Sequence, residues 1–198
     1  MNDPFSILID SFIENKVGLV ENFISGSLAT HLKVNLEELF SAQKFQLAGT
    51  GNALDITHNK LVRSDLIYWL DKAHNNAAED AFFQLMEEFI RYLNSTCYTG
   101  ITDYEFHYAL YPMGTFYKKH KDQFQNNRSR QFSMIVYLNS NWKEADGGEL
   151  CIHHVNHLQR IRPINRTAVF FKSSELEHEV LLTNVPRMSI TGWLKTNV

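Results

Sequence analysis

The sequence has too few cysteines for a protein that is held together by disulfide bonds. Its 198 residues include two, Cys97 and Cys151, and no CxxC pair. A disulfide framework needs more cysteines than this. We therefore expect a reducing compartment and a cytoplasmic protein.

Long apolar runs are also missing. No stretch approaches the roughly 20 residues that cross a bilayer. The first residues, MNDPFSILIDSFIENK, mix acidic with apolar side chains and have no basic start, unlike a secretory leader. The sequence thus predicts no membrane partner.

The chain has no large excess of positive or negative charge. The formal net charge is −3 at pH 7, and no run of Lys or Arg stands out, which makes nucleic acid a poor partner. Four prolines and nine glycines are too few for a disordered or fibrous chain. The length fits one domain over residues 1–198 and leaves the oligomeric state open.

Helical signals lie in the first half of the chain. Residues 17–24 read as a short strand, and Ser25 or Ser27 can cap a helix that runs to about Phe40. Asn76 with Glu79 resembles a capping box. It precedes an apolar stripe at helical spacing, which we assign to core packing: Phe82, Leu85, Met86, Phe89, Ile90 and Leu93.

The period changes to that of strands after Thr102. Residues 104–111 alternate, with Tyr104, Phe106, Tyr108 and Leu110 on one face. Further short strands are predicted at 131–139, 148–153, 166–172, 179–183 and 188–194, with turns at 126–127, 146–148 and 156–157. The fold class is therefore α+β, mainly β. We expect helices and strands of residues 1–100 to support a double-stranded β-helix, or jelly roll, over residues 101–198.

Three residues have the chemistry of a metal site. His120 and Asp122 flank one residue, and side chains at i and i+2 of an extended backbone share a face. Alone, this pair also fits a solvated loop, because Lys118, Lys119 and Lys121 surround it. His178 adds a second imidazole, and two histidines with one carboxylate form the facial triad of non-haem iron(II), which leaves positions open for a keto acid and dioxygen.

Arg187 is a candidate for holding the far end of such a keto acid. It follows His178 by nine residues and begins a predicted strand. Its guanidinium can bind a carboxylate with two parallel hydrogen bonds, whereas a surface arginine is the simpler alternative for this residue alone. Ser189 and Thr191 share its face of the strand and could add hydroxyl donors.

These residues together resemble a known family. The spacing of His120, Asp122, His178 and Arg187 is similar to that of 2-oxoglutarate-dependent prolyl hydroxylases, above all the hypoxia-inducible-factor prolyl hydroxylase group and its bacterial relatives. The strings YPMGTFYKKHKD, SMIVYLNSNW, GGEL and RMSITGW carry the resemblance, which covers most of the chain from about Asp55.

The resemblance implies an oxidoreductase that uses Fe(II), 2-oxoglutarate and O2 and that hydroxylates a prolyl residue of a protein or peptide with release of succinate and CO2. It also leads us to expect stimulation by ascorbate (vitamin C). His120, Asp122 and His178 would bind iron. Arg187, Tyr137 and Thr191 would hold 2-oxoglutarate. Tyr111 would line the metal site, and Arg130 and Tyr117 would contact substrate. Each tyrosine also fits a role as a core aromatic residue.

Some features depart from the animal members of this family. The loop from Asp122 to Arg130 is rich in Gln and Asn, and the substrate-facing segment 49–63 is only loosely similar. A free amino acid or small molecule therefore stays open as the substrate.

Other kinds of protein fit part of the pattern. A cupin-like metal enzyme without a keto acid would not need Arg187, and a non-enzymatic jelly roll would bind no metal. His153, His154 and His157 form an HHxxH string that could bind metal on a helix, although the surrounding sequence favours a hairpin around 156–157. His107 reads as an ordinary surface or core residue.

Overall fold

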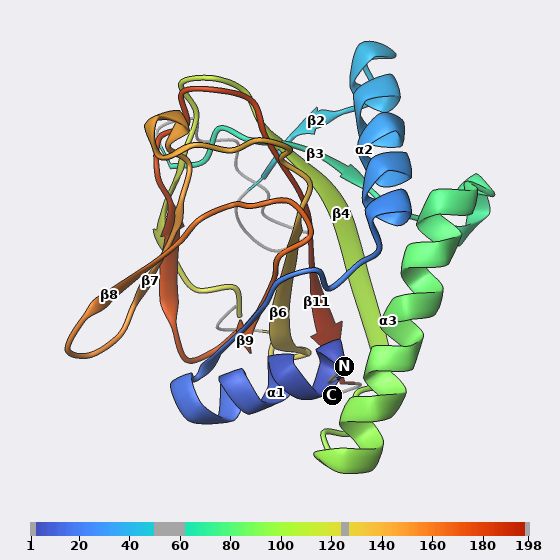
Figure 1. The fold of residues 1–198 in the computed structure, drawn as a ribbon, viewed down its shortest axis with the longest axis vertical. Coiled ribbons are helices and arrows are strands. Elements are labelled where there is room, and N and C mark those ends of the chain that lie inside the picture. The colour runs from blue at the N-terminus through green and yellow to red at the C-terminus, as the bar shows by residue number, and fades with distance from the viewer. Residues whose placement is uncertain (1–2, 50–61, 124–126, 197–198) are drawn as a thin grey trace.

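The computed structural model describes residues 3–49, 62–123 and 127–196, which form two antiparallel sheets with helices on one side (Figure 1). The larger sheet has the strand order β1 (Val17–Val20), β9 (Ala168–Lys172), β6 (Arg130–Tyr137), β11 (Arg187–Lys195), β4 (Asp103–Tyr111), β3 (Leu66–Trp69) and β2 (Gln46–Leu47). The smaller sheet has the order β5 (Tyr117–His120), β10 (Glu177–Val180), β7 (Leu150–His153) and β8 (Leu158–Ile161). This arrangement confirms the predicted jelly roll.

Alternation along the strands of the larger sheet separates two hydrophobic cores. In β4, Phe106 and Tyr108 face the helices, whereas Ala109 and Tyr111 face the smaller sheet. The other strands of this sheet divide in the same way, since successive side chains point to opposite faces. One core therefore anchors the helices, and the other fills the space between the two sheets, where the candidate site lies.

Three α-helices pack on the outer face of the larger sheet: α1 (Pro4–Asn15), α2 (Gly26–Ser41) and α3 (Ala77–Thr96). Two short 3₁₀ helices cover Lys72–His74 and Glu144–Asp146. Ser25 caps α2 by accepting a hydrogen bond from the Leu28 amide, and Asn76 caps α3 through the amides of Ala78 and Glu79. Both caps were predicted.

Several boundaries differ from the prediction. The strand expected at 17–24 ends at Val20, and the strand expected at 179–183 lies at Glu177–Val180, which puts His178 inside it. Helix α1 was not predicted, although Asp3 caps it and Pro4 occupies its first turn. Residues 50–61 of the expected substrate-facing segment, and Asn126 of the expected turn at 126–127, lie outside the described residues.

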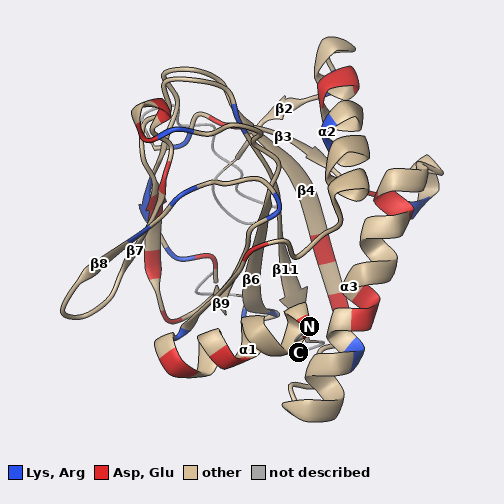
Figure 2. Cartoon of the chain, in the orientation of Figure 1, with Lys and Arg blue, Asp and Glu red and all other residues tan. Residues whose placement is uncertain are grey.

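Basic and acidic residues are interspersed along the ribbon, with acidic segments on α1 and α3 (Figure 2). No helix within the described ranges combines the length and the apolar character needed to cross a membrane.

Candidate metal centre

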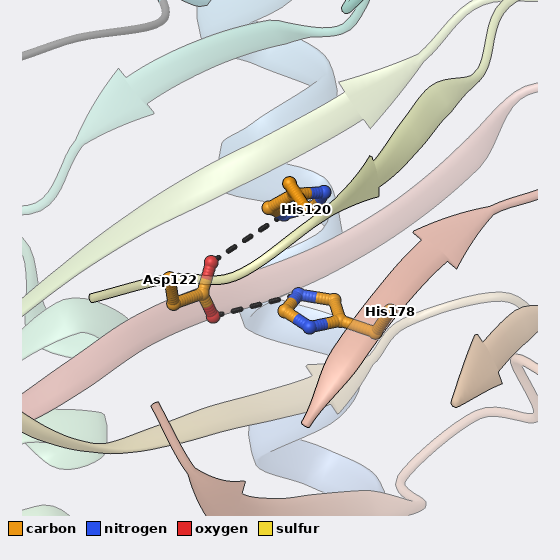
Figure 3. A group of neighbouring side chains, drawn as sticks. All are labelled: His120, Asp122 and His178. Carbon is orange, nitrogen blue, oxygen red and sulfur yellow. Dashed lines mark ion pairs between the residues drawn. The ribbon is translucent and has the colours of Figure 1, made fainter. Parts of the chain in front are cut away.

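Strand pairing in the smaller sheet brings the three predicted ligands together. His120 ends β5, and the register of the antiparallel pair places it opposite His178 of the neighbouring β10. Asp122 follows two residues after His120. Its position past the strand end lets its carboxylate turn toward both imidazoles (Figure 3).

The ligand atoms of these three residues lie within 4.8 Å of one another. The Asp122 carboxylate lies between the rings, with Oδ1 at 3.5 Å from His120 Nε2 and Oδ2 at 3.5 Å from His178 Nε2. The ring centroids of the two histidines are 4.3 Å apart. No other group of three or more potential ligands with this proximity occurs in the described part of the chain.

Backbone carbonyls set the tautomer of both histidines. His120 Nδ1 lies 2.7 Å from the Lys118 carbonyl oxygen, and His178 Nδ1 lies 3.3 Å from that of Leu176. A carbonyl oxygen only accepts, so each Nδ1 carries the hydrogen and donates it. Each Nε2 is then left with a lone pair directed at the centre of the cluster, as a metal ligand requires.

The charge states of the cluster suit a cation. Burial raises the pKa of Asp122, but its contacts with His178, His120 and Ser133 outweigh this and hold that pKa well below its usual range. Burial lowers the pKa of His178 to about 4, against the attraction of Asp122. One carboxylate anion and a neutral His178 are therefore present at neutral pH.

A hydroxyl pair orients the carboxylate from the other side. Ser133 Oγ of β6 donates to Asp122 Oδ2 at 2.6 Å, and it lies 2.9 Å from Ser173 Oγ. Both serines are buried. Because Ser133 belongs to the larger sheet, this hydrogen bond ties the Asp122 loop to the sheet opposite the histidines.

Arg187 is buried in the same pocket and is only partly paired. It begins β11, is 2% exposed and lines the pocket together with the three candidate ligands. Its Nε donates to the Gly148 carbonyl at 2.9 Å, whereas its Nη2 is buried without a hydrogen-bond partner in the described residues. Gly148 has a φ of +74°, and a Cβ there would lie 3.1 Å from Arg187 Cδ, so glycine suits both the turn and the close approach.

Two tyrosines flank this guanidinium. Its central carbon lies 4.8 Å from the ring centroid of Tyr111 and 5.0 Å from that of Tyr137. The Tyr137 hydroxyl is buried and has no hydrogen-bond partner among the described residues. Burial raises the pKa of both tyrosines, so each keeps its proton and can donate it.

The remaining predicted residues lie at the same pocket or beside it. Thr191 lines the pocket, and its hydroxyl is 3.2 Å from that of Ser189. Tyr117 also lines it and stacks on His120 with ring centroids 3.5 Å apart. Arg130 pairs with Glu105, with Nη2 at 2.7 Å from Oε1, and covers the ring of Trp193, which lines the pocket.

A buried ion pair next to Tyr117 was not predicted from the sequence. The Asp65 side chain is fully buried, and its two oxygens accept from Arg63 Nε at 2.6 Å and Nη2 at 2.9 Å. The Arg63 guanidinium lies 4.5 Å from the Tyr117 ring centroid, and Arg63 lines the pocket. The i and i+2 spacing of this Arg-x-Asp was the available signal, the same spacing that singled out His120 and Asp122.

The HHxxH string lies on a hairpin, as predicted. The His154 amide donates to the His157 carbonyl at 3.0 Å in the turn between β7 and β8. His153 pairs with Glu179 at 2.9 Å, and the rings of His154 and His157 stack on each other. This string is therefore not a helical metal motif.

Comparison with known proteins relates this pocket to a family. Residues 106–195, which include all three candidate ligands and Arg187, match the model of the 2OG-Fe(II) oxygenase superfamily. Over these residues the chain is similar to that superfamily. The name of this superfamily refers to iron(II) and 2-oxoglutarate (2OG), the metal and the keto acid that its members use.

The chain also resembles individual proteins beyond the matched residues. It is 29% identical to a hypoxia-inducible factor prolyl hydroxylase of Caenorhabditis elegans, over 94% of this chain but 27% of that protein, so it spans about a quarter of that relative's length. It superposes on a Pseudomonas putida prolyl-4-hydroxylase with a TM-score of 0.88 and 27% identity, covering 98% of this chain and 100% of the other. A Trichoplax adhaerens prolyl hydroxylase has a TM-score of 0.86 at 24% identity, over 96% and 88% of the chains, and shows the same fold.

The pocket fits both groups. Two imidazoles and one carboxylate are the donor set of non-haem iron(II) sites with open positions. The unpaired Arg187 Nη2 and Tyr137 hydroxyl are buried donors that an anionic carboxylate would satisfy. A cupin-like enzyme without a keto acid would leave these donors unexplained.

Proposed function

We propose that this protein is an Fe(II)- and 2OG-dependent dioxygenase that hydroxylates a prolyl residue of a protein or peptide and releases succinate and CO2. The observation that carries the proposal is the pairing of a three-ligand cluster with a buried, half-paired arginine in one pocket. His120, Asp122 and His178 would hold the iron. Arg187, Tyr137 and Thr191 would hold the distal carboxylate of 2OG.

The surroundings of the proposed metal ligands and 2OG-binding residues suggest a role for each of them. His120 and His178 can present Nε2 to a metal because their Nδ1 atoms donate to backbone carbonyls. Asp122 supplies one negative charge, and Ser133 fixes its orientation. Arg187 and Tyr137 would both donate hydrogen bonds to the 2OG carboxylate from the larger sheet, and Arg187 would also supply a positive charge. Tyr111 would line the metal site between them.

When bound, iron and 2OG would supply the oxidation, in which one atom of O2 enters succinate and the other enters the hydroxyl group of the product. The protein contributes position, charge and shelter from water. The carboxylate of Asp122 also favours hydroxylation over halogenation, because it fills the position that a halide would need.

The choice of a prolyl substrate is supported by the relatives. Those from C. elegans and P. putida are named prolyl hydroxylases, and the T. adhaerens structure contains a peptide fragment of hypoxia inducible factor. Arg130 and Tyr117 are then the proposed substrate contacts. A free amino acid or small molecule is the alternative substrate. A cytoplasmic location and a stimulation by ascorbate stay predictions.

An anaerobic titration tests the cofactor pair without knowledge of the target. Fe(II) and then 2OG are added to the protein, and the visible metal-to-ligand charge-transfer band is recorded. We expect the band in the wild type and its loss in His178→Ala, whereas His153→Ala serves as the control because His153 lies outside the cluster. A full-strength band in His178→Ala would remove that residue from the metal site.

A further inference from the structure

His107 has no role in the proposal so far, yet it lines the same pocket as the metal ligands. It lies on β4, is 1% exposed, and both of its ring nitrogens are buried without a hydrogen-bond partner in the described part of the chain. Buried polar groups are almost always hydrogen-bonded in folded proteins. An unpaired imidazole that faces a binding pocket therefore points to a ligand.

The imidazole of His107 is neutral. Burial lowers its pKa well below the ordinary value, and the nearby charges of Arg63 and Arg130 lower it further, against a smaller opposing effect of Asp122. A neutral imidazole has one N–H donor and one acceptor nitrogen. The side chain thus suits a polar but uncharged group.

Trp193 provides a second unpaired donor next to His107. The ring centroids of the two residues are 5.5 Å apart, both line the pocket, and Trp193 Nε1 is buried without a partner in the described residues. The Arg130 guanidinium covers the indole face at 3.4 Å, and Trp69 packs against the His107 ring at 5.0 Å. Both rings are therefore held in place before any ligand arrives.

Strand geometry places this pair away from the Arg187 end of the proposed binding site of 2OG. His107 lies four residues before Tyr111, which is the register partner of Arg187, so it is about 13 Å away along β4. The four C–C bonds of a five-carbon diacid, at about 1.5 Å each, span at most about 6 Å. A keto acid whose far end is held by Arg187 therefore does not cover the whole length of this face, and Thr191, which lies opposite His107, marks where the two sites would meet.

The pair lies instead close to the metal cluster. Trp193 is the register partner of Ser133, the residue that donates to Asp122. His107 is the register partner of Thr191, on the strand beside it. In the proposed reaction the carbon to be hydroxylated must come close to the iron, so it would lie in this part of the pocket.

We propose that His107 and Trp193 form a neutral hydrogen-bonding site that holds a carbonyl oxygen of the substrate next to the carbon to be hydroxylated. The inference rests on the proposed function and deepens it. A prolyl residue in a peptide has no N–H, so its nearest polar groups are carbonyl oxygens, which accept from N–H donors. Two neutral donors at the reacting end match this chemistry.

N-acetylproline methylamide is a minimal probe that carries such carbonyls. It is titrated into protein loaded with Zn(II) and 2OG, which is inert to oxidation, and the indole N–H signals are followed by NMR. The sequence has three tryptophans, so three indole signals are expected, and Trp193→Phe assigns the relevant one. We expect the Trp193 signal to shift on binding.

A matched pair of variants isolates His107. His107→Phe keeps a planar ring without polar atoms, and we expect it to weaken probe binding about 3- to 10-fold, which corresponds to one neutral hydrogen bond. His107→Gln retains a donor and an acceptor and should recover part of the affinity. The affinities for Zn(II) and 2OG should stay at the wild-type values in both.

A melting curve without ligand provides a readout that does not involve binding. Replacing an unpaired buried imidazole by a ring of similar shape removes a desolvation penalty. The melting temperature of His107→Phe should therefore equal or exceed that of the wild type, whereas a residue needed for packing would lower it.

Each remaining outcome overturns one specific statement. If the wild type binds Zn(II) and 2OG but not the probe, or if His107→Phe binds the probe as tightly as the wild type, the carbonyl site is wrong. A loss of 2OG affinity in His107→Phe would assign the imidazole to the keto acid instead. If the wild type does not bind 2OG, the proposed function itself fails.

Discussion

Unpaired polar atoms are concentrated around the pocket. Six buried side-chain nitrogen or oxygen atoms lack a partner in the described residues, and five of them belong to His107, Tyr137, Arg187 and Trp193. The sixth belongs to Arg166, which precedes β9 and does not line the pocket. Folding alone disfavours such atoms, because each carries a desolvation cost of about 1–3 kcal/mol. Their clustering is the residue-level evidence that this pocket is built to bind.

Arg187→Ala should weaken 2OG binding about 10- to 100-fold, because charge-assisted hydrogen bonds contribute about 1.5–3 kcal/mol. Tyr137→Phe should weaken it less, about 3- to 10-fold, because it removes one hydrogen bond to the carboxylate but no positive charge. Metal affinity should not change in either variant, since neither side chain is a ligand. The measurement is an anaerobic 2OG titration of the Fe(II) protein.

Arg162→Ala is the control for this titration, because Arg162 is exposed. It should bind 2OG like the wild type. An unchanged 2OG affinity in Arg187→Ala would mean that another cation, such as Arg63, binds the distal carboxylate.

The buried His107 should make stability depend on pH. Its pKa is depressed in the folded state, while the unfolded chain keeps a value near 6.5. The unfolded state therefore takes up a proton as the pH falls through 6.5 and the folded state does not, so the free energy of unfolding decreases below that pH. Other groups, His178 included, add to this dependence.

Urea unfolding of metal-free protein between pH 8 and 5 measures the effect. We expect the wild type to lose stability over this range and His107→Phe to lose less. Equal slopes would show that the folded protein can protonate His107 at little cost, in conflict with its burial among Arg63 and Arg130.

At the scale of elements, the sequence was most informative where a pattern repeats. The apolar stripe of α3 and the alternation of β4 predicted both elements, because each reflects one buried face. Helix α1 was missed, since its short apolar face is shared with β1 and β9 and its buried residues are only Leu8 and Ile9. Its contacts depend on tertiary packing that the local sequence does not reveal.

The site residues also fall into those that the sequence predicts and those that it does not. His120, Asp122, His178 and Arg187 were predicted because their residue types and spacing have a chemical meaning before folding. His107 was not, because a single histidine on an alternating strand has no such meaning. Its importance comes from the absence of a hydrogen-bond partner, and that depends on what β3 and β11 place around it.

The contact between α1 and β1 gives a test at this scale. A Cβ on Gly18 would lie 2.5 Å from the Leu8 carbonyl oxygen, so Gly18→Ala must push α1 away from the sheet. We expect a loss of about 1–3 kcal/mol in the free energy of unfolding, as for other overpacked sites. Urea unfolding provides the measurement.

Gly26→Ala is the matched control, because a Cβ there would meet only Arg166 Nη1 at 3.4 Å. It should change stability little. A Gly18→Ala variant as stable as the wild type would show that α1 shifts freely on the sheet and is not anchored by this contact.

The pocket as a whole joins the two sheets. His120 and His178 lie on the smaller sheet, whereas Arg187, Tyr137 and Thr191 lie on the larger one. Besides the core between them, the hydrogen bond from Ser133 to Asp122 links these halves of the site. A metal with bound 2OG would add a second link, from the histidine pair to Arg187.

Joint binding of metal and 2OG should therefore stabilise the entire fold. A ligand present at 100 times its dissociation constant adds about 2.7 kcal/mol, which corresponds to a rise of about 5–10 °C in the melting temperature for a chain of this size. Zn(II) with 2OG should produce this rise in the wild type. Arg187→Ala should show the increment from Zn(II) but only a small further increment from 2OG, because the link to the larger sheet is lost. If 2OG raises the melting temperature equally in both proteins, the keto acid does not connect the two sheets through Arg187.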